Sequence, residues 1–150
     1  MGSSGKEKSG TVKASVSGKA SGVTRLRGDN SVGARSMPES LAAEAAVLGS
    51  MIIDPECIGE VVEFMETSAF YRIEHRMIFD ALVGLYEKNR GEGIDGVLLR
   101  DELEKRKQLE EVGGVEYLAR VAESVPSSAN VMYYAGIVKD KMLLLSLIHI

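Results

Sequence analysis

Few residues in this 150-residue sequence could carry chemistry. A phosphate-binding loop for ATP requires Gly, four residues and then Gly-Lys-Ser/Thr, because backbone amides cradle the phosphates and the hydroxyl holds magnesium. The nearest match is Gly18-Lys19, but Ala20 replaces the hydroxyl residue and Lys13 stands in place of the first glycine. The motif fails at two positions, so we predict no cofactor for this chain.

Cysteine and histidine are equally scarce, with one cysteine and two histidines in the whole sequence. These are too few for any zinc-ligand spacing, and no Ser/His/Asp triad can be identified from spacing alone. His75, beside Glu74 and Arg76, could transfer protons, but a packed or capping role is favoured because one histidine without partners makes no site. We therefore predict no catalytic residue and no metal site. The lone Cys57 cannot form an internal disulfide, which fits a reducing, cytoplasmic setting.

Charge is distributed unevenly along the chain. Residues 1–36 hold seven basic and two acidic residues, a net charge of +5, so residues 37–150 carry −9 of the total of −4. The negative charge of residues 37–150 argues against a broad binding surface for duplex DNA, because such a surface needs clustered Lys and Arg. An acidic domain is better suited to protein partners. No apolar run is long enough to cross a bilayer, so we expect no membrane partner.

The basic segment, residues 1–36, is rich in Ser, Gly and Lys and poor in large apolar side chains. It cannot bury enough surface to offset the entropy of ordering, which predicts a disordered basic tail. Two alternatives stay open. The segment could be a transit peptide for organellar import, since such peptides are basic, although no amphipathic stripe is visible. It could also bind nucleic acid weakly and in a salt-sensitive way.

Helical patterning begins at Pro38, which fits a first helical turn because its missing N–H costs nothing there. Asp54 and Asp95 are suited to capping helices, and Asn130 is suited to capping the last one. Turn residues cluster at 89–93, 113–114 and 126–128. Apolar residues between these breaks recur at helical spacing, in the stripes Leu41/Ala45/Leu48/Ile52, Ile58/Val61/Val62/Met65, Ile78/Ala81/Leu82/Leu85, Leu99/Leu103/Arg106 and Val115/Leu118/Ala119/Ala122.

No segment alternates with the period of a strand. The fold class is therefore all-α, a small helical bundle of five to six helices preceded by the basic tail. We place the helical domain at residues 37–128 and the start of a further helix at residues 129–144. Tyr133 and Tyr134 in that helix could stack on nucleobases, but packing is favoured because no basic groove surrounds them.

Four groups of residues follow one another in a distinctive order. They are Glu44–Ser50 leading to Asp54-Pro55, Phe70-Tyr71 with His75-Arg76, Ile78-Phe79 and Ala81, Leu109 with Gly113-Gly114 and Tyr117-Leu118, and Pro126 with Ala129-Asn130, Tyr134-Ala135, Ile137-Val138 and Lys141. Gly49 allows a neighbouring helix to approach closely, and Gly113-Gly114 allows a sharp reversal. Together these groups resemble the N-terminal domain of the DnaB-like helicases. The resemblance covers about residues 38–142, and its strength is the ordered set, since no single group is specific.

The resemblance implies the function of a longer parent protein. Such helicases form hexameric rings around single-stranded DNA and unwind the replication fork with ATP and Mg²⁺, in a RecA-like motor domain that this sequence does not include. Their N-terminal domains form a collar of paired subunits where primase docks, and a helicase loader is a possible further partner. The last helix begins a hairpin that pairs two subunits. The resemblance therefore makes Tyr134, Ile137, Val138 and Lys141 the candidates for a subunit interface.

The sequence departs from the family at Ile73, where proline is common, at Leu98, where a capping Thr is common, and at its end. Residues 145–150 read Leu-Ser-Leu-Ile-His-Ile, which one reading frame of a transposon-based sequencing adapter encodes. We therefore expect residues 145–150 to be adapter read-through, with a natural apolar helix end as the alternative. A different function also stays open, namely a stand-alone, non-enzymatic helical adaptor or a primase-side helicase-binding module.

Overall fold

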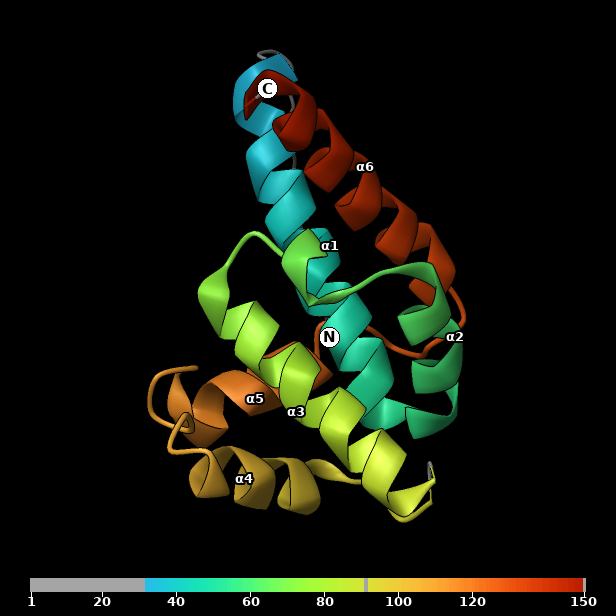
Figure 1. Ribbon diagram of the computed structural model, residues 1–150, viewed down its shortest axis with the longest axis vertical. Coiled ribbons are helices and arrows are strands. Elements are labelled where there is room, and N and C mark those ends of the chain that lie inside the picture. Colours follow the sequence, from blue (N-terminus) through green and yellow to red (C-terminus); the bar gives the residue numbers. More distant parts are fainter. Residues whose placement is uncertain (1–31, 91, 150) are drawn as a thin grey trace, which may run out of the picture. The chain divides into compact units, whose positions relative to one another are not determined.

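The computed structural model describes the backbone of residues 32–90 and 92–149 and the side chains of residues 39–90 and 92–147 (Figure 1). Within those residues the chain is helical, with no strand, which confirms the predicted all-α class. The chain divides into two units, Met1–Met37 and Pro38–Ile150, and all packing described below lies within the second. The helices are α1 Val32–Ile53, α2 Ile58–Phe64, α3 Ile73–Asn89, α4 Gly96–Lys105, α5 Gly114–Ala122 and α6 Val131–His149, with short 3-10 turns η2 Pro55–Cys57 and η3 Thr67–Ala69.

The predicted helix starts are mostly confirmed. Asp54 accepts a hydrogen bond from the backbone N–H of Glu56, and Asp95 accepts one from that of Leu98, so both aspartates cap the turn that follows. Before α5 the chain reverses through Gly113 and Gly114, with φ of +113° and +75°. Those values lie where glycine is favoured over residues with a Cβ, as the predicted sharp turn requires.

The start of α1 differs from the prediction, because the helix begins at Val32 and passes through Pro38. A proline inside a helix removes the hydrogen bond to the carbonyl four residues earlier, here that of Ala34, and its ring crowds that carbonyl, but the turns on either side keep their own hydrogen bonds. Residues 32–36 therefore belong to α1 and not to a disordered tail. The predictions of disorder or import for residues 1–31 fall outside the described residues.

The end of the chain is also helical, since α6 continues as far as His149. The expected division at residues 144 and 145 is therefore not a break in secondary structure. Whether residues 145–150 derive from an adapter concerns the origin of the sequence and stays a prediction.

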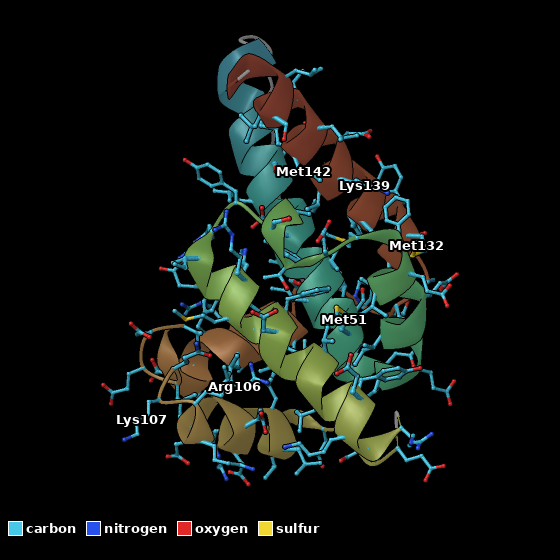
Figure 2. All side chains as sticks on the ribbon, viewed as in Figure 1. Met51, Arg106, Lys107, Met132, Lys139 and Met142 are labelled. Carbon is cyan, nitrogen blue, oxygen red and sulfur yellow. The ribbon has the colours of Figure 1, made fainter. Side chains whose placement is uncertain are left out.

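The core is centred on the C-terminal half of α1. Residues 46–51 are buried at every position, and Leu48 and Met51 are fully enclosed. Figure 2 shows Met51 on α1 among the side chains of the neighbouring helices. The single stripe predicted for α1 is therefore wrong, because Leu41, Ala45 and Ile52 are only half-buried. A stripe describes a helix with one covered face, whereas this helix is covered by several neighbours. The stripe predicted for α3 is confirmed, since all four of its members are buried.

Candidate functional site

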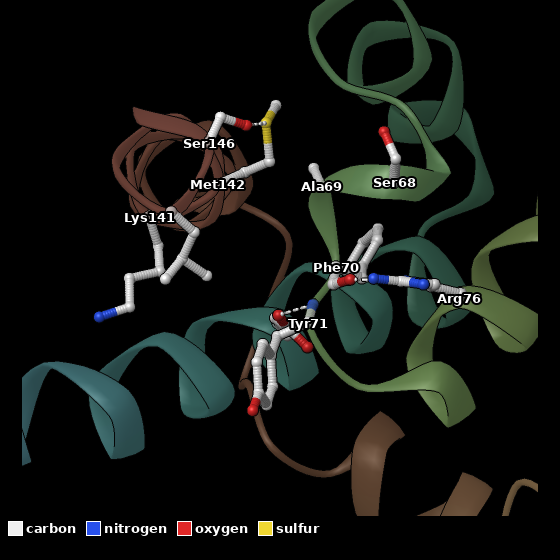
Figure 3. A pocket seen from close by; sticks show the side chains of 10 residues that line it. Ser68, Ala69, Phe70, Tyr71, Arg76, Lys141, Met142 and Ser146 are labelled. Carbon is white, nitrogen blue, oxygen red and sulfur yellow. Dashed lines mark hydrogen bonds between the residues drawn. The ribbon is translucent and has the colours of Figure 1, made fainter. Parts of the chain in front are cut away.

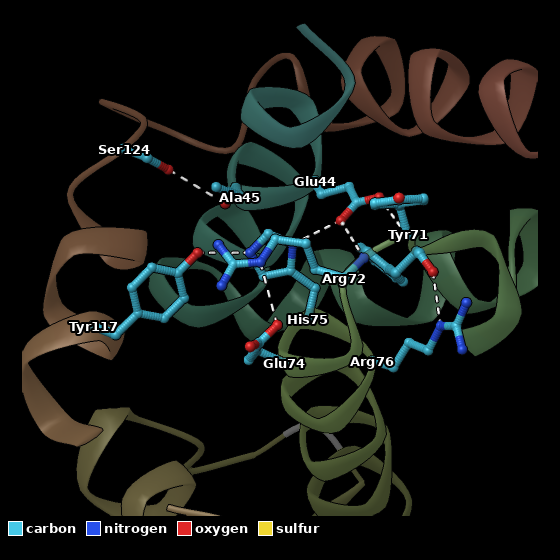
Figure 4. Close-up of polar contacts among 10 residues, drawn as sticks. Glu44, Ala45, Tyr71, Arg72, Glu74, His75, Arg76, Tyr117 and Ser124 are labelled. Carbon is cyan, nitrogen blue, oxygen red and sulfur yellow. Dashed lines mark hydrogen bonds and ion pairs between the residues drawn. The ribbon is translucent and has the colours of Figure 1, made fainter. Parts of the chain in front are cut away.

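A buried polar cluster joins three helices. It consists of Glu44 from α1, His75 from α3 and Tyr117 from α5 (Figure 4). His75 Nδ1 lies 2.7 Å from Glu44 Oε1, and His75 Nε2 lies 2.7 Å from the Tyr117 hydroxyl. Each ring nitrogen of His75 thus has one partner, and each partner comes from a different helix.

Glu44 also binds the backbone that leads into α3. Its carboxylate accepts hydrogen bonds from the backbone N–H groups of Tyr71 and Arg72, and Arg72, the N-cap of α3, makes no capping bond with its own side chain. Tyr71 precedes the N-cap, so of the two N–H groups only that of Arg72 belongs to the start of the helix. A carboxylate from α1 therefore holds the segment that enters α3.

The Glu44 carboxylate defines one hydrogen-bond role in the cluster. Because a carboxylate oxygen only accepts, Nδ1–H of His75 donates to it, while Nε2 is hydrogen-bonded to the Tyr117 hydroxyl. Glu44 and His75 are each 1% exposed, so the surrounding protein encloses both groups. The cluster is therefore a structural connection, which confirms the packed reading of His75.

Tyr117 links this cluster to the surface. Its ring is approached by the guanidinium of Arg72, 5.6 Å from the ring centroid, and by that of Arg120, at 5.4 Å. Burial raises the pKa of the Tyr117 hydroxyl, so the phenol keeps its proton at neutral pH. Sequence reasoning missed this partnership. The available signal was Glu44 itself, a carboxylate within the otherwise apolar Leu41–Leu48 segment.

A second polar connection joins α3 to α4. The Glu102 carboxylate accepts hydrogen bonds from Arg106 Nε at 2.9 Å and from Lys88 Nζ at 3.2 Å. These bonds, above all the one from Arg106, lower the pKa of Glu102. The Arg106 guanidinium lies over Gly84 of α3, where a Cβ would stand 2.6 Å from its Nη2. This contact explains why Arg106 continues the apolar side of its helix, as predicted.

The candidate interface residues of α6 divide between two environments. Tyr134, Ile137 and Lys141 are half-buried and recur at spacings of three and four, which places them on one side of the helix. Val138 is fully buried in the core of the same chain. It can support the candidate surface only from beneath, because Val131, Ala135 and Val138 form the face of α6 that packs inward.

A cavity of about 240 Å³ lies beside this part of α6, and Figure 3 shows its lining. Met142 and Ser146 border it from α6, and Phe70 and Tyr71 border it from the segment before α3. The Arg76 side chain donates to the Phe70 carbonyl there, at 2.8 Å. The ionisable side chains of Glu44, Arg76 and Lys141 also line the cavity, and those of Glu44 and Arg76 are held by the hydrogen bonds already described.

Two other features to consider in the described residues are a metal site and a membrane-spanning helix. No group of three or more His, Cys, Asp or Glu side chains in residues 39–90 and 92–147 is arranged to hold a metal ion. Among the helices traced in the structure, none is both long and apolar enough to cross a membrane.

Comparison with known proteins assigns the class of this all-helical domain. The family described as "DnaB-like helicase N terminal domain" matches residues 36–140, and the chain belongs to that family. Two similar relatives are the replicative DNA helicase DnaB of Mycobacterium leprae, 42% identical over 114 residues, and that of Geobacillus stearothermophilus, 44% identical over 111 residues. These alignments cover 76% and 74% of this chain but only 18% and 24% of the helicases, so the chain spans about a fifth of their length.

Solved structures agree with the family assignment. The N-terminal domain of DnaB helicase from Mycobacterium tuberculosis matches with a TM-score of 0.68 and 41% identity, over 73% of this chain and 78% of that one. The N-terminal domain of DnaB from Helicobacter pylori, described together with its interactions with primase, matches with a TM-score of 0.64 over 80% of this chain and 91% of that one. At 22% identity, the second match supports the fold alone.

Proposed function

We propose that this chain is the N-terminal collar domain of a replicative DNA helicase and that it serves hexamer assembly and contact with primase. The observation that carries the proposal is the flank of α6. On it, Tyr134, Ile137 and Lys141 are aligned and half-buried beside the face that anchors the helix in the core. A helix held rigidly on one side and apolar on the other is suited to pair with a second copy.

The solvent-exposed surface of α6 carries several large apolar side chains. Tyr133, Leu143 and Leu144 are 68%, 51% and 53% exposed, in addition to the half-buried Tyr134 and Ile137. Exposed apolar area of this kind marks protein contacts. We infer that α6 pairs two subunits, as the first helix of the hairpin that the family resemblance implies.

The activity of the whole helicase is part of the same proposal. The relatives are named replicative DNA helicases, and this chain covers 18–27% of the lengths of four of them. We infer an ATP-dependent, Mg²⁺-dependent motor in the remaining part of the parent protein, acting on single-stranded DNA in the cytoplasm. A helicase loader would be a further partner of that assembly.

Primase is the proposed partner of the collar outside the ring. The support is the shared fold with the H. pylori domain, whose published description concerns its interactions with primase. The net charge of −9 over residues 37–150 supports a protein partner for this domain over a nucleic acid.

The second candidate function is a stand-alone helical adaptor or a primase-side module. Fold alone does not separate the two, because one fold can host different functions. The family match over residues 36–140, together with relatives all named as helicases, favours the helicase side.

Light scattering across a range of protein concentrations, combined with an ATPase assay, tests the proposal. We expect concentration-dependent self-association and no ATP turnover above a heat-killed control, because the sequence contains no phosphate-binding loop. A strictly monomeric chain at all concentrations would contradict the assembly role. Measurable ATP turnover would contradict the assignment of the motor to another part of the parent.

A further inference from the structure

An open apolar groove lies between α4 and α5. Figure 1 shows these two helices on a part of the domain separate from α6. Its volume is about 350 Å³. Leu99 of α4 and Leu118 of α5 form its floor and belong to the core, at 1% and 7% exposure. Ile52, near the end of α1, closes one side.

The walls of the groove are apolar side chains that the fold leaves in solvent. Val97 of α4 and Val115 of α5 are 56% and 52% exposed. Ala119 and Ala122 continue the α5 wall at spacings of four and three, so the apolar line follows this helix for about 10 Å at 1.5 Å per residue. Both are small residues, which keeps the groove open along its length.

This geometry corrects the stripe predicted for α5. Val115 and Ala119 were expected in the core, but both are exposed, and the buried residues of α5 are Leu118 and Val121. The apolar side of α5 is wider than the part that packs into the core. The uncovered apolar residues, Val115 and Ala119, face the groove.

The charges around the groove are mainly negative. Asp95 lines it at the start of α4, and Glu116 and Glu123 are exposed on α5 next to the lining, where Arg120, also exposed, is the one basic residue among them. The cation in the lining is Arg100, whose Nη2 donates to the Asp101 carboxylate at 3.0 Å and is thereby balanced. A basic partner would match this rim.

We propose that the groove binds an amphipathic helix of another protein, with basic side chains flanking its apolar stripe. An apolar groove that follows an exposed helix suits a partner helix, whose residues at i, i+3, i+4 and i+7 enter the groove. The acidic rim selects basic residues on either side of that stripe. This surface is additional to the α6 surface of the proposed function and does not depend on it.

The test uses a fluorescent synthetic helix of about five turns, with leucines at i, i+3, i+4 and i+7 and lysines elsewhere. Its binding to the full chain is measured by anisotropy for the wild type, Ala119→Glu and Ala129→Glu. Ala119→Glu places a carboxylate in the groove, whereas Ala129→Glu places the same group at an exposed position before α6. Circular dichroism checks that both variants fold.

Ala119→Glu makes the protein more acidic, so simple charge attraction predicts equal or tighter binding of the basic peptide. Groove binding predicts the opposite, a loss of roughly tenfold or more, with Ala129→Glu close to wild type. Equal or tighter binding by Ala119→Glu would overturn the proposal. If that variant does not fold, the double variant Glu116→Gln with Glu123→Gln replaces it, and unchanged affinity there overturns the proposal.

Two further outcomes separate other occupants of the groove. A peptide with glutamate in place of lysine must bind much more weakly than the lysine peptide, and equal binding would contradict the basic partner. If the groove instead receives a second copy of this chain, Ala119→Glu will reduce self-association without any peptide present. That result would replace the proposed partner by a homotypic contact.

Discussion

The imidazole of His75 donates from Nδ1 to a carboxylate oxygen of Glu44 across 2.7 Å, and both side chains are almost completely buried. The pair links the first helix of the core to the N-terminus of α3, and Tyr117 extends the link to α5. Buried polar groups are costly unless each one has a partner. The cluster therefore favours one relative placement of three helices, and that placement supports the surfaces proposed for binding.

Removing His75 should be strongly destabilising. His75→Ala leaves the Glu44 carboxylate buried without its side-chain partner, and breaking a buried pair on one side costs about 3–5 kcal/mol. We expect a loss of that order in the free energy of unfolding, measured by urea denaturation followed by circular dichroism. A loss below about 1 kcal/mol, the value of an ordinary hydrogen bond, would show that the cluster is incidental.

The hydroxyl of Tyr117 should contribute less. Tyr117→Phe removes one hydrogen bond and leaves Nε2 of His75 without its hydrogen-bond partner, at a cost of about 1–3 kcal/mol. Tyr133→Phe is the matched control, because it removes the same hydroxyl group from a side chain that is 68% exposed to solvent. Equal unfolding free energies for the two variants would refute the role assigned to Tyr117.

Gly49 should be irreplaceable for a steric reason. A Cβ at this position would stand 2.3 Å from the backbone carbonyl oxygen of Val121, so α1 and α5 would have to separate. Overpacking of this kind costs about 1–3 kcal/mol, and we expect Gly49→Ala to lower the thermal midpoint of unfolding. The control is Gly136→Ala in α6, where a Cβ meets nothing within 4 Å. That variant should stabilise the chain by about 0.5–1 kcal/mol, because alanine favours helix. A stable Gly49→Ala variant would contradict the close approach.

Glu102 should give the domain a pH-dependent contribution to stability. Its pKa is lowered by the hydrogen bond from Arg106 and then by Lys88, so the contribution is present above the ordinary carboxyl pKa of 4.5 and is lost as pH falls. The free energy of unfolding should therefore be higher for the wild type than for Glu102→Gln at pH 7, and the difference should shrink below pH 4.5. Glu104→Gln, at an exposed position of the same helix, serves as the control. A difference that grew on acidification would have the wrong sign.

Cys57 should be unreactive while the domain is folded. Burial, and then the negative charge of Asp54, raises the pKa of its thiol to about 11, and the thiolate is the reactive form. We expect a thiol reagent at pH 8 to modify Cys57 slowly in buffer and rapidly in denaturant. Rapid modification in buffer would indicate that the segment around η2 opens readily.

The sequence predicted the fold class and the helix starts well, because they depend on local chemistry. Caps and turns depend on residues that are adjacent in the sequence and not on the rest of the chain. This holds for the caps at Asp54 and Asp95 and for the turn at Gly113-Gly114. The close approach at Gly49 was also expected. It followed from a resemblance to known relatives and from the special property of glycine.

The errors concern which side chains of a helix are buried by neighbouring helices. The expected stripe of α1 failed because the helix is covered on several sides, and that of α5 failed because part of it faces the groove with Val115 and Ala119. Both outcomes are set by neighbours distant in sequence. The partnership of Glu44, His75 and Tyr117 spans 31 and 42 residues of chain, and no local pattern encodes such distances.

The central claim is that α6 assembles subunits, and sedimentation equilibrium of two matched variants tests it most directly. Ile137→Asp places a carboxylate on the proposed surface, and Ala129→Asp places one at an exposed position just before the helix. With both variants shown to be folded by circular dichroism, we predict that Ile137→Asp weakens self-association at least tenfold, about 1.4 kcal/mol, while Ala129→Asp associates like the wild type. Self-association that is unchanged by Ile137→Asp would contradict the assignment of α6 as the subunit interface.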